Sequence, residues 1–200
     1  LEQAYYTLNN EYIESVWNLL KIIWDKGLIY QDYKVVPYDP RIGATLSSHE
    51  VAQGYREIED PSIIVRFPVR GQENTSFLVW TTTPWTLPAN LALAVGQDVK
   101  YAFVRYGDET LVMAAALVAS VFRERKYQIV KTVQGDELAG LYYQRLFDEL
   151  DASGDICRVL TADFVSTDDG TGIVHIAPAY GVDDLDLGQR NGLPVVHGVG

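Results

Sequence analysis

The first thirty residues carry the clearest helical pattern of the chain. Apolar side chains recur there at spacings of three and four, which places them on one face of a helix. Asn9 or Asn10 can cap the start of this helix, and Gly27 suits the position just past its end. The pattern predicts an amphipathic N-terminal helix whose apolar stripe needs a partner to cover it. The stripe consists of Ile13, Val16, Trp17, Leu20, Ile23 and Trp24.

From residue 33 onwards the apolar positions alternate or fall in short runs, as they do in β-strands. Gly107-Asp108 and Asp169-Gly170 are typical of hairpin turns. Many short strands with few long helices predict an α+β, β-rich fold, a barrel or a sandwich, and we expect a β-barrel-like domain with small peripheral helices. The expected strands span residues 33–38, 62–69, 76–83, 91–95, 100–106, 110–115, 128–133, 158–165 and 172–176.

Three adjacent threonines end one of these predicted strands, and Pro84 follows them. Because side chains alternate along a strand, Thr81 and Thr83 share one face while Thr82 points the other way. Small donor and acceptor groups thus gather where strand pairing stops, which suits the binding of a polar ligand or a water. Threonine runs also occur in strands simply because threonine favours them.

A second polar group follows the predicted strand at 172–176. His175 lies in that strand, and Asp183 and Asp184 fall at the start of a short helix, where free amides and the helix dipole favour carboxylates. The imidazole and Asp184 are thus nine residues apart, beside one strand end. Each group alone has an ordinary structural explanation, as a half-buried histidine and as acids that begin a helix.

Composition limits the classes of function. The 200 residues carry 16 Lys and Arg against 27 Asp and Glu, a net charge of -11. A nucleic-acid binder is expected to be basic, so phosphate contacts would have to lie outside this chain or on a local basic patch. The three histidines are scattered and the single cysteine, Cys157, has no partner, so no metal-ligand spacing is present.

The same composition bears on location. One cysteine excludes an internal disulfide and fits a reducing compartment. The longest apolar run, 111–122, is shorter than the roughly 18 to 20 residues of a membrane span. The N-terminus also lacks the pattern of a secretory signal. We therefore expect a cytoplasmic protein that does not enter a membrane.

Taken together, the two polar segments resemble a known family. Residues 80–90, Trp-Thr-Thr-Thr-Pro-Trp-Thr-Leu-Pro-Ala-Asn, and 170–184, Gly-Thr-Gly-Ile-Val-His-Ile-Ala-Pro-Ala-Tyr-Gly-Val-Asp-Asp, resemble the editing (CP1) insertion of isoleucyl-tRNA synthetase, a class I aminoacyl-tRNA synthetase. Valyl and leucyl relatives carry an Arg after a Thr pair where this chain has Thr83-Pro84-Trp85. On this resemblance, residues 1–47 are a helix and a leading segment that flank the insertion, and residues 48–200 are the editing domain.

The resemblance implies hydrolysis of mischarged valyl-tRNA(Ile), and possible cleavage of valyl-adenylate is left open. Valine is smaller than isoleucine by one methylene and must enter the synthetic pocket of the enzyme. One methylene is worth only about 1–3 kcal/mol in a hydrophobic pocket, and this pair of amino acids is the standard example of that limit. A second pocket that admits valine and excludes isoleucine would reverse this selection by size, so that only the smaller amino acid is hydrolysed.

The resemblance also implies roles for seven residues. His175 matches the residue that abuts the substrate side chain and excludes isoleucine, and Asp184 matches the carboxylate that holds the substrate α-ammonium. Asp183 is the less favoured of the adjacent pair. The wall around the ester and terminal adenosine matches Thr81, Thr82, Thr83 and Asn90, which we assign to catalysis, and Trp85, which we assign with His175 and Asp184 to substrate binding.

An aminoacyl ester is already activated, so its hydrolysis mainly requires a positioned water and stabilisation of the oxyanion. The general base stays open between His175 and a hydroxyl of the terminal ribose. Relatives often have Cys-Pro-Arg-Cys-Gly as half of a zinc site, whereas this chain has Asp-Pro-Arg-Ile-Gly at 39–43, so we expect no zinc. We expect no cofactor in this chain, with ATP and magnesium used by the whole synthetase.

The expected partners are the 3′ end of tRNA(Ile) carrying valine and the remainder of the synthetase in cis. The chain resembles an excised piece of that enzyme, which we expect to be monomeric. Two other classes stay open. One is a catalytically silent domain that binds an amino acid or serves as a structural insert, and the other is a trans-acting editing factor that works alone.

Overall fold

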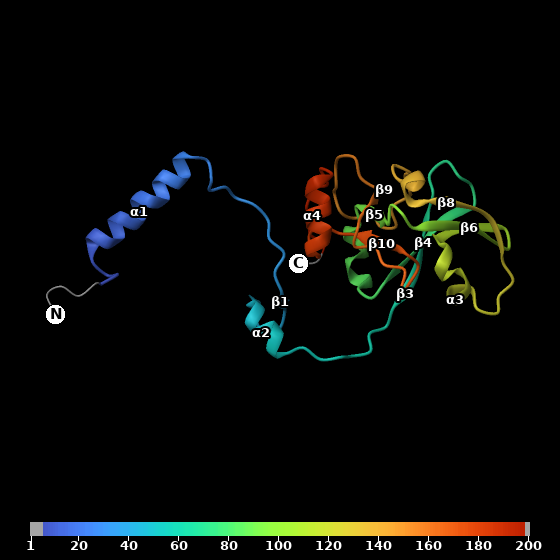
Figure 1. Cartoon of the computed structure of the whole chain (residues 1–200), viewed down its shortest axis with the longest axis horizontal. Coiled ribbons are helices and arrows are strands. Elements are labelled where there is room, and N and C mark those ends of the chain that lie inside the picture. Colours follow the sequence, from blue (N-terminus) through green and yellow to red (C-terminus); the bar gives the residue numbers. More distant parts are fainter. Residues whose placement is uncertain (1–5, 199–200) are drawn as a thin grey trace. The chain divides into compact units, whose positions relative to one another are not determined.

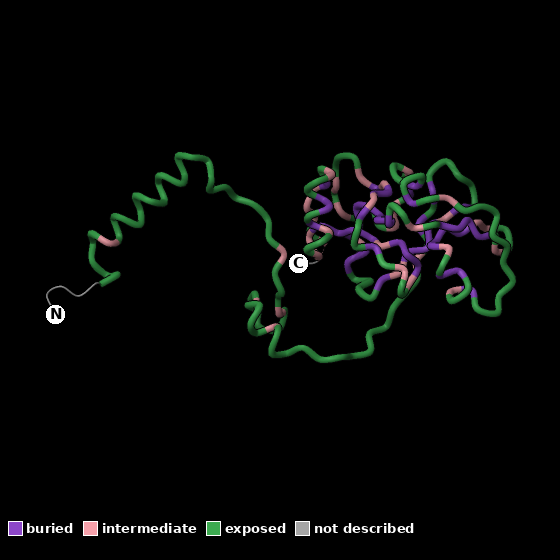
Figure 2. Tube along the Cα trace, viewed as in Figure 1, coloured by how far each residue is buried: buried purple, intermediate pink, exposed green. Residues whose placement is uncertain are grey.

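The computed structural model describes residues 6–198 and divides into two units, Leu1–Lys34 and Val35–Gly200 (Figure 1). The first unit contains helix α1 (Asn10–Asp25), which confirms the predicted N-terminal helix. Asn9 occupies the N-cap position, and the amide of Gly27, at φ +68°, donates to the carbonyl of Trp24. No residue of α1 is buried, so its apolar stripe is uncovered (Figure 2).

The leading segment forms little regular structure. Of the strand predicted at 33–38, only its last residue pairs, as β1 (Tyr38–Asp39) with β2 (Ala44–Thr45). Pro37 has no amide hydrogen to donate to a ladder, which is one reason for the difference. Helix α2 (Ser48–Gln53) then begins with a capping box between Ser47 and Glu50. The predicted boundary after residue 47 stays a prediction.

A five-stranded sheet forms the larger layer of the second unit. Its order is β3-β4-β7-β6-β8, with β4 and β7 parallel and the other pairs antiparallel. The predicted turn Gly107-Asp108 joins β6 to β7 as a two-residue hairpin loop, with Gly107 at φ +61°. The strands are β3 (Ile63–Pro68), β4 (Thr75–Thr81), β6 (Lys100–Tyr106), β7 (Glu109–Ala114) and β8 (Gln128–Gln134).

A three-stranded sheet forms the second layer, in the order β10-β5-β9. Strand β5 (Ala92–Val95) pairs antiparallel with β10 (Ile173–Ile176) and parallel with β9 (Arg158–Thr161). Because β9 and β10 lie on opposite sides of β5, the turn at 169–170 does not close a hairpin, contrary to the prediction. Helix α4 (Val182–Arg190) follows β10.

The strand-rich α+β class is confirmed, but the sheets do not close into a barrel. In the described residues the sheets are open, with β3 and β8 at the edges of the larger one. The remaining helices are small, as predicted. They are the 3₁₀ turns η1 (Pro84–Ala89), η2 (Ala115–Leu117) and η3 (Gly135–Leu138) and helix α3 (Val118–Phe122).

Two apolar clusters form the core. The larger lies on the five-stranded sheet and includes Phe67, Phe77 and Val112, while the smaller includes Leu91 and Ile176 beneath α4. Figure 2 shows the buried residues concentrated in the sheets. Strand β4 contacts β10 where the two sheets meet.

A buried tyrosine joins the two layers. The hydroxyl of Tyr101, on β6, accepts a hydrogen bond from the amide of Gly96 at 2.9 Å and donates one to the carbonyl of Gly172 at 2.7 Å. Gly96 follows β5 and Gly172 precedes β10, so one side chain of the large sheet fixes two strands of the small one. Burial raises the pKa of Tyr101 to about 12, which keeps the donor protonated.

The variant Tyr101→Phe tests this link. It leaves a buried amide and a buried carbonyl unpaired, so we expect the free energy of unfolding to fall by about 1–3 kcal/mol in urea titrations. Tyr106→Phe is the matched control, because the hydroxyl of Tyr106 has no hydrogen bond within residues 6–198. An equal effect of the two substitutions would remove Tyr101 from this role.

Candidate active site

The three threonines lie where β4 ends. The strand stops at Thr81 rather than at the predicted residue 83, because Thr83 leaves the extended backbone and Pro84 begins η1. The Thr81 hydroxyl is buried and accepts a hydrogen bond from the amide of Thr83 at 3.0 Å. Thr82 and Thr83 are exposed residues. Local hydrogen bonding thus folds the triplet back on itself.

His175 reaches the same place from β10. Its Nε2 lies 3.0 Å from the hydroxyl oxygen of Thr86, and that hydroxyl lies 2.8 Å from the carbonyl of Thr83, to which it donates. A hydroxyl has one hydrogen, so Nε2 must donate to Thr86 and Nδ1 carries the free lone pair. Nδ1 is buried and has no hydrogen-bond partner within the described part of the chain. Burial lowers the pKa of His175 to about 4, so the imidazole is neutral near pH 7.

Asp184 comes from the first turn of α4. Its Oδ1 accepts a hydrogen bond from the amide of Ala177 at 2.7 Å. Desolvation raises the pKa of Asp184, the Ala177 amide opposes this shift, and the neighbouring charge of Asp183 adds to it. A Cβ on Gly181 would lie 2.1 Å from Oδ2 of Asp184, so a glycine is needed beside the carboxylate. Asp183 itself is exposed.

These groups line one pocket of about 220 Å³. Trp85, which is 59% exposed, stands on its rim with its ring edge-to-face against Tyr180, the centroids being 6.1 Å apart. The pocket therefore combines a hydroxyl wall, an imidazole, a carboxylate and the aromatic side chains of Trp80, Trp85 and Tyr180. Six predicted site residues line it together, namely Thr81, Thr82, Thr83, Trp85, His175 and Asp184.

Asn90 is the predicted site residue that the structure does not bring into this pocket. Its side chain is 1% exposed, its Nδ2 donates to the carbonyl of Ala92 at 2.8 Å, and its Oδ1 accepts from the hydroxyl of Tyr143 at 2.6 Å. Both the nitrogen and the oxygen of the side-chain amide thus form hydrogen bonds inside the core. This geometry places Asn90 between η1 and β5 with hydrogen bonds to the core, and its predicted catalytic role stays a prediction.

Sequence reasoning missed five residues that line the pocket, namely Trp80, Thr86, Val174, Ala177 and Tyr180. Thr86 lies three positions after Thr83, and the proline at 84 could have indicated the tight turn that brings the two together. Tyr180 lies within the second polar segment, but no periodic pattern there assigns its direction.

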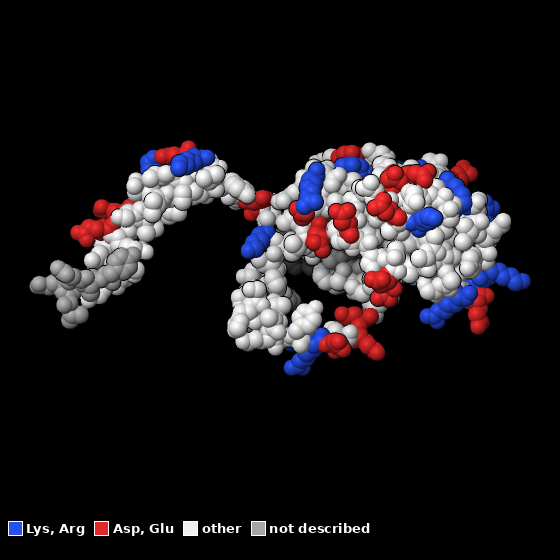
Figure 3. All heavy atoms as spheres, in the orientation of Figure 1, with Lys and Arg blue, Asp and Glu red and all other residues white. Residues whose placement is uncertain are grey.

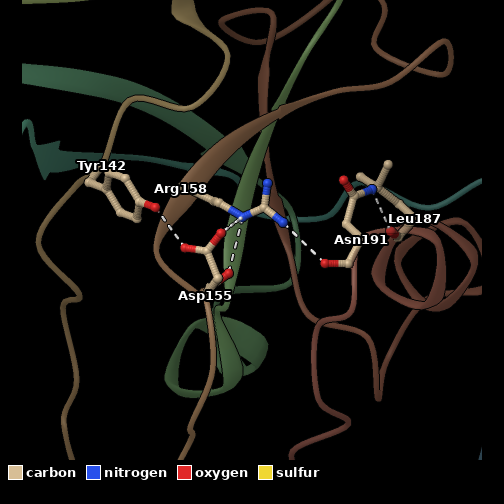
Figure 4. Close-up of polar contacts among 5 residues, drawn as sticks. All are labelled: Tyr142, Asp155, Arg158, Leu187 and Asn191. Atoms are coloured by element: carbon tan, nitrogen blue, oxygen red, sulfur yellow. Dashed lines mark hydrogen bonds and ion pairs between the residues drawn. The ribbon is translucent and has the colours of Figure 1, made fainter.

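A polar network anchors the far end of α4 (Figure 4). Arg158, on β9, donates from Nη2 to the carbonyl of Asn191 at 3.1 Å and forms an ion pair with Asp155 at 3.0 Å. The hydroxyl of Tyr142 donates to the same carboxylate at 2.7 Å, and the side chain of Asn191 caps the carbonyl of Leu187. The helix that carries the pocket carboxylate is therefore held at both ends.

Within residues 6–198, no group of three or more His, Cys, Asp or Glu side chains could hold a metal ion, and no helix has the length and apolar character that a membrane span requires.

The buried imidazole predicts a pH dependence of stability. Its pKa is about 4 in the folded chain and about 6.5 when unfolded, so the unfolded state binds more protons between these values. Titration of this group therefore leaves the free energy of unfolding unchanged above about pH 6.5 and decreases it as the pH falls towards 4. Asp184, whose pKa is raised, acts in the opposite direction at the acidic end.

Between about pH 7 and pH 5 we expect the parent chain to lose about 2 kcal/mol more unfolding free energy than His175→Gln. Gln keeps a donor for Thr86 but does not titrate. Urea unfolding at the two pH values measures the difference. Equal losses in the two proteins would show that the folded imidazole titrates as it does in the unfolded chain.

Comparison with known proteins gives consistent matches. The family model described as tRNA synthetases class I (I, L, M and V) matches residues 1–176. Isoleucine–tRNA ligase of Thermoplasma volcanium is 48% identical over 195 residues, that of Clostridium tetani 47% over 197, and that of Thermus thermophilus 49% over 201. Each match covers 98% of this chain and 19% of the relative, so the chain spans about a fifth of their length.

Two solved structures have a fold similar to that of this chain. The crystal structure of GlLeuRS-CP1 matches with a TM-score of 0.56 and 15% identity, over 68% of this chain and 66% of that chain. The editing domain of Plasmodium falciparum cytosolic leucyl-tRNA synthetase matches with a TM-score of 0.50 and 10% identity, over 90% and 61%. At these identities the likeness concerns the fold.

Proposed function

This chain belongs to the class I tRNA synthetases (I, L, M and V), and we propose that it hydrolyses valine esterified to tRNA(Ile), as the editing domain of an isoleucine–tRNA ligase. One observation carries the proposal. Six residues from two segments about ninety positions apart meet in a pocket of about 220 Å³. Family membership supports tRNA and the rest of the synthetase in cis as partners. We propose with them ATP and magnesium for the whole enzyme and a cytoplasmic location.

Selection is proposed to depend on the size of the pocket beside His175. The imidazole is buried, neutral and held by Thr86, so its ring is a fixed, uncharged wall with little freedom to move aside. A valine side chain fits against such a wall, whereas the extra methylene of isoleucine would have to displace it. Overpacking a rigid site costs about 1–3 kcal/mol, which is the range that this selection needs.

Asp184 is proposed to bind the α-ammonium group of the substrate. The Ala177 amide fixes Oδ1, Oδ2 packs against Gly181 where a side chain would clash with it, and the carboxylate lines the pocket. An ammonium placed there would form a charge-assisted hydrogen bond and would bring down the raised pKa of the carboxylate. An acyl group without the amine would lack this contact.

The chemistry is a direct attack by water on the ester carbonyl. The water oxygen bonds to the carbonyl carbon, a tetrahedral oxyanion forms, and its collapse breaks the bond to the ribose oxygen, which takes up a proton. We propose that the hydroxyls of the threonine triplet orient the water and stabilise the oxyanion.

His175 is a poor general base in this arrangement. Its Nε2 donates to Thr86 and its Nδ1 is buried, so neither nitrogen offers a lone pair to the water. A hydroxyl of the terminal ribose is therefore the proposed group that orients the water. Two rival functions make different predictions for this chain alone. A silent amino-acid-binding insert would show no hydrolysis, and a trans-acting factor would show full hydrolysis.

Asp184→Asn tests the ammonium contact. Asn keeps an oxygen for the Ala177 amide but removes the charge, so we expect kcat/KM for valyl-tRNA hydrolysis to fall about 10- to 100-fold, or roughly 1.5–3 kcal/mol. Asp183→Asn is the control, since this neighbour is exposed and outside the pocket lining. Similar rates for both variants and the parent would refute the assignment of Asp184.

His175→Ala tests the size selection. Removing the ring enlarges the pocket, so we expect hydrolysis of isoleucyl-tRNA to rise at least about tenfold while valyl-tRNA is still cleaved. His49→Ala, an exposed change in α2, is the control. His175→Gln, which keeps a donor for Thr86, should retain discrimination. If His175→Ala still rejects isoleucine, the imidazole does not act in selection.

A further inference from the structure

A second, larger hollow adjoins the candidate active site. It measures about 940 Å³ and lies over β3, β4 and β7 and beside α3. Trp80, the residue before the threonine triplet, lines both this hollow and the pocket of about 220 Å³. The two spaces thus share one wall. We call the larger one the arginine groove, because Arg66, Arg123 and Arg125 line it.

The groove is basic although the chain is acidic. Three arginines face one glutamate, Glu124, in its lining, whereas the chain as a whole has a net charge of -11. Arg66 pairs with Glu109 at 3.1 Å. Arg123 and Arg125 are exposed and form no ion pair within residues 6–198, so two guanidinium groups are available to an anion. Figure 3 shows basic side chains gathered at the edge of the domain near α3.

Aromatic side chains accompany these charges. Trp80, Tyr106 and Phe122 line the groove. A Cβ on Gly170 would lie 2.8 Å from the Trp80 ring, so the backbone of this glycine packs directly against the indole and leaves no room for a side chain. Basic grooves with aromatic rings are the usual means of binding single-stranded nucleic acid, through phosphate contacts and base stacking.

We propose that the arginine groove binds the phosphodiesters of the single-stranded nucleotides that precede the terminal adenosine of the tRNA. The terminal nucleotide then lies on the far side of Trp80, in the editing pocket. This inference rests on the proposed function, and it names the surface that holds the RNA strand on an otherwise acidic chain. Arg123 and Arg125 supply the phosphate contacts, and Glu124 opposes them.

The test measures binding and hydrolysis separately. The binding probes are two fluorescein-labelled RNA hairpins without an attached amino acid, one with a single-stranded 3′ overhang and one with a blunt end. Binding is measured by fluorescence anisotropy over a range of salt concentrations. The proteins are the parent chain, the double variant R123Q/R125Q, E124Q, and R70Q as a control for the loss of one exposed arginine outside both hollows. Circular dichroism checks the fold of each.

We expect R123Q/R125Q to bind the overhang hairpin roughly tenfold more weakly, with a slope of log K against log salt that is flatter by about 1.4 for two lost phosphate contacts. E124Q should bind it more tightly, an effect that misfolding cannot produce. R70Q and the blunt hairpin should show neither change. Failure of the parent to prefer the overhang, or equal affinities across the variants, overturns the groove proposal.

Hydrolysis distinguishes a failure of the groove from a failure of the function. With valyl-adenosine, which lacks the preceding nucleotides, R123Q/R125Q should match the parent, whereas KM for valyl-tRNA should rise roughly tenfold. Equal loss on both substrates counts against the groove. Absence of hydrolysis by the parent refutes the proposed function, while the anisotropy result still decides whether the groove binds RNA.

Discussion

The junction between two open sheets is the constraint on which the site depends. The threonine triplet belongs to the larger sheet and His175 to the smaller one, so neither sheet alone contains the pocket. Tyr101 holds the sheets together by using both functions of one buried hydroxyl, accepting from the loop after β5 and donating to the loop before β10. A buried hydroxyl with two fixed partners tolerates little displacement, since any shift leaves two backbone groups unpaired. A hydrogen bond in the core therefore fixes the relative position of the two sheets whose residues line the pocket.

Helix α4 completes the pocket and is held at each end by a hydrogen bond to the smaller sheet or to the residue that follows one of its strands. Its first turn is fixed by the bond between Ala177 and Asp184, and its last turn by the contacts of Arg158 with Asn191. Holding a nine-residue helix at both ends restrains its rotation as well as its translation. A single carboxylate on such a helix can thus face a small pocket with a defined direction, although it lies in a segment that is otherwise surface-exposed on one side.

The sequence predicted the local features well and the long-range ones poorly. Alternating apolar positions identified the strands of both sheets, and the pair at 107–108 identified a true hairpin. Residues 33–37 also alternate but find no partner strand, and periodicity carries no information about partners. The expectation of a barrel-like arrangement has the same origin, because the spacing of strands does not tell whether their sheets close. In the pocket, the six residues came from a family resemblance, whereas the burial of Asn90 and the inward position of Thr86 depend on how η1 turns, which spacing does not encode.

The shared wall at Trp80 has a consequence for how ligands act on each other. A ligand that fixes the indole from one side alters the space on the other, because the same ring bounds both hollows. Two ligands that meet at one wall are thermodynamically linked, and linkage is reciprocal: the factor by which the first changes the affinity of the second equals the factor by which the second changes that of the first. On the proposed function, an amino-acid ester presented alone and the same ester on its RNA strand would therefore be different substrates for this domain.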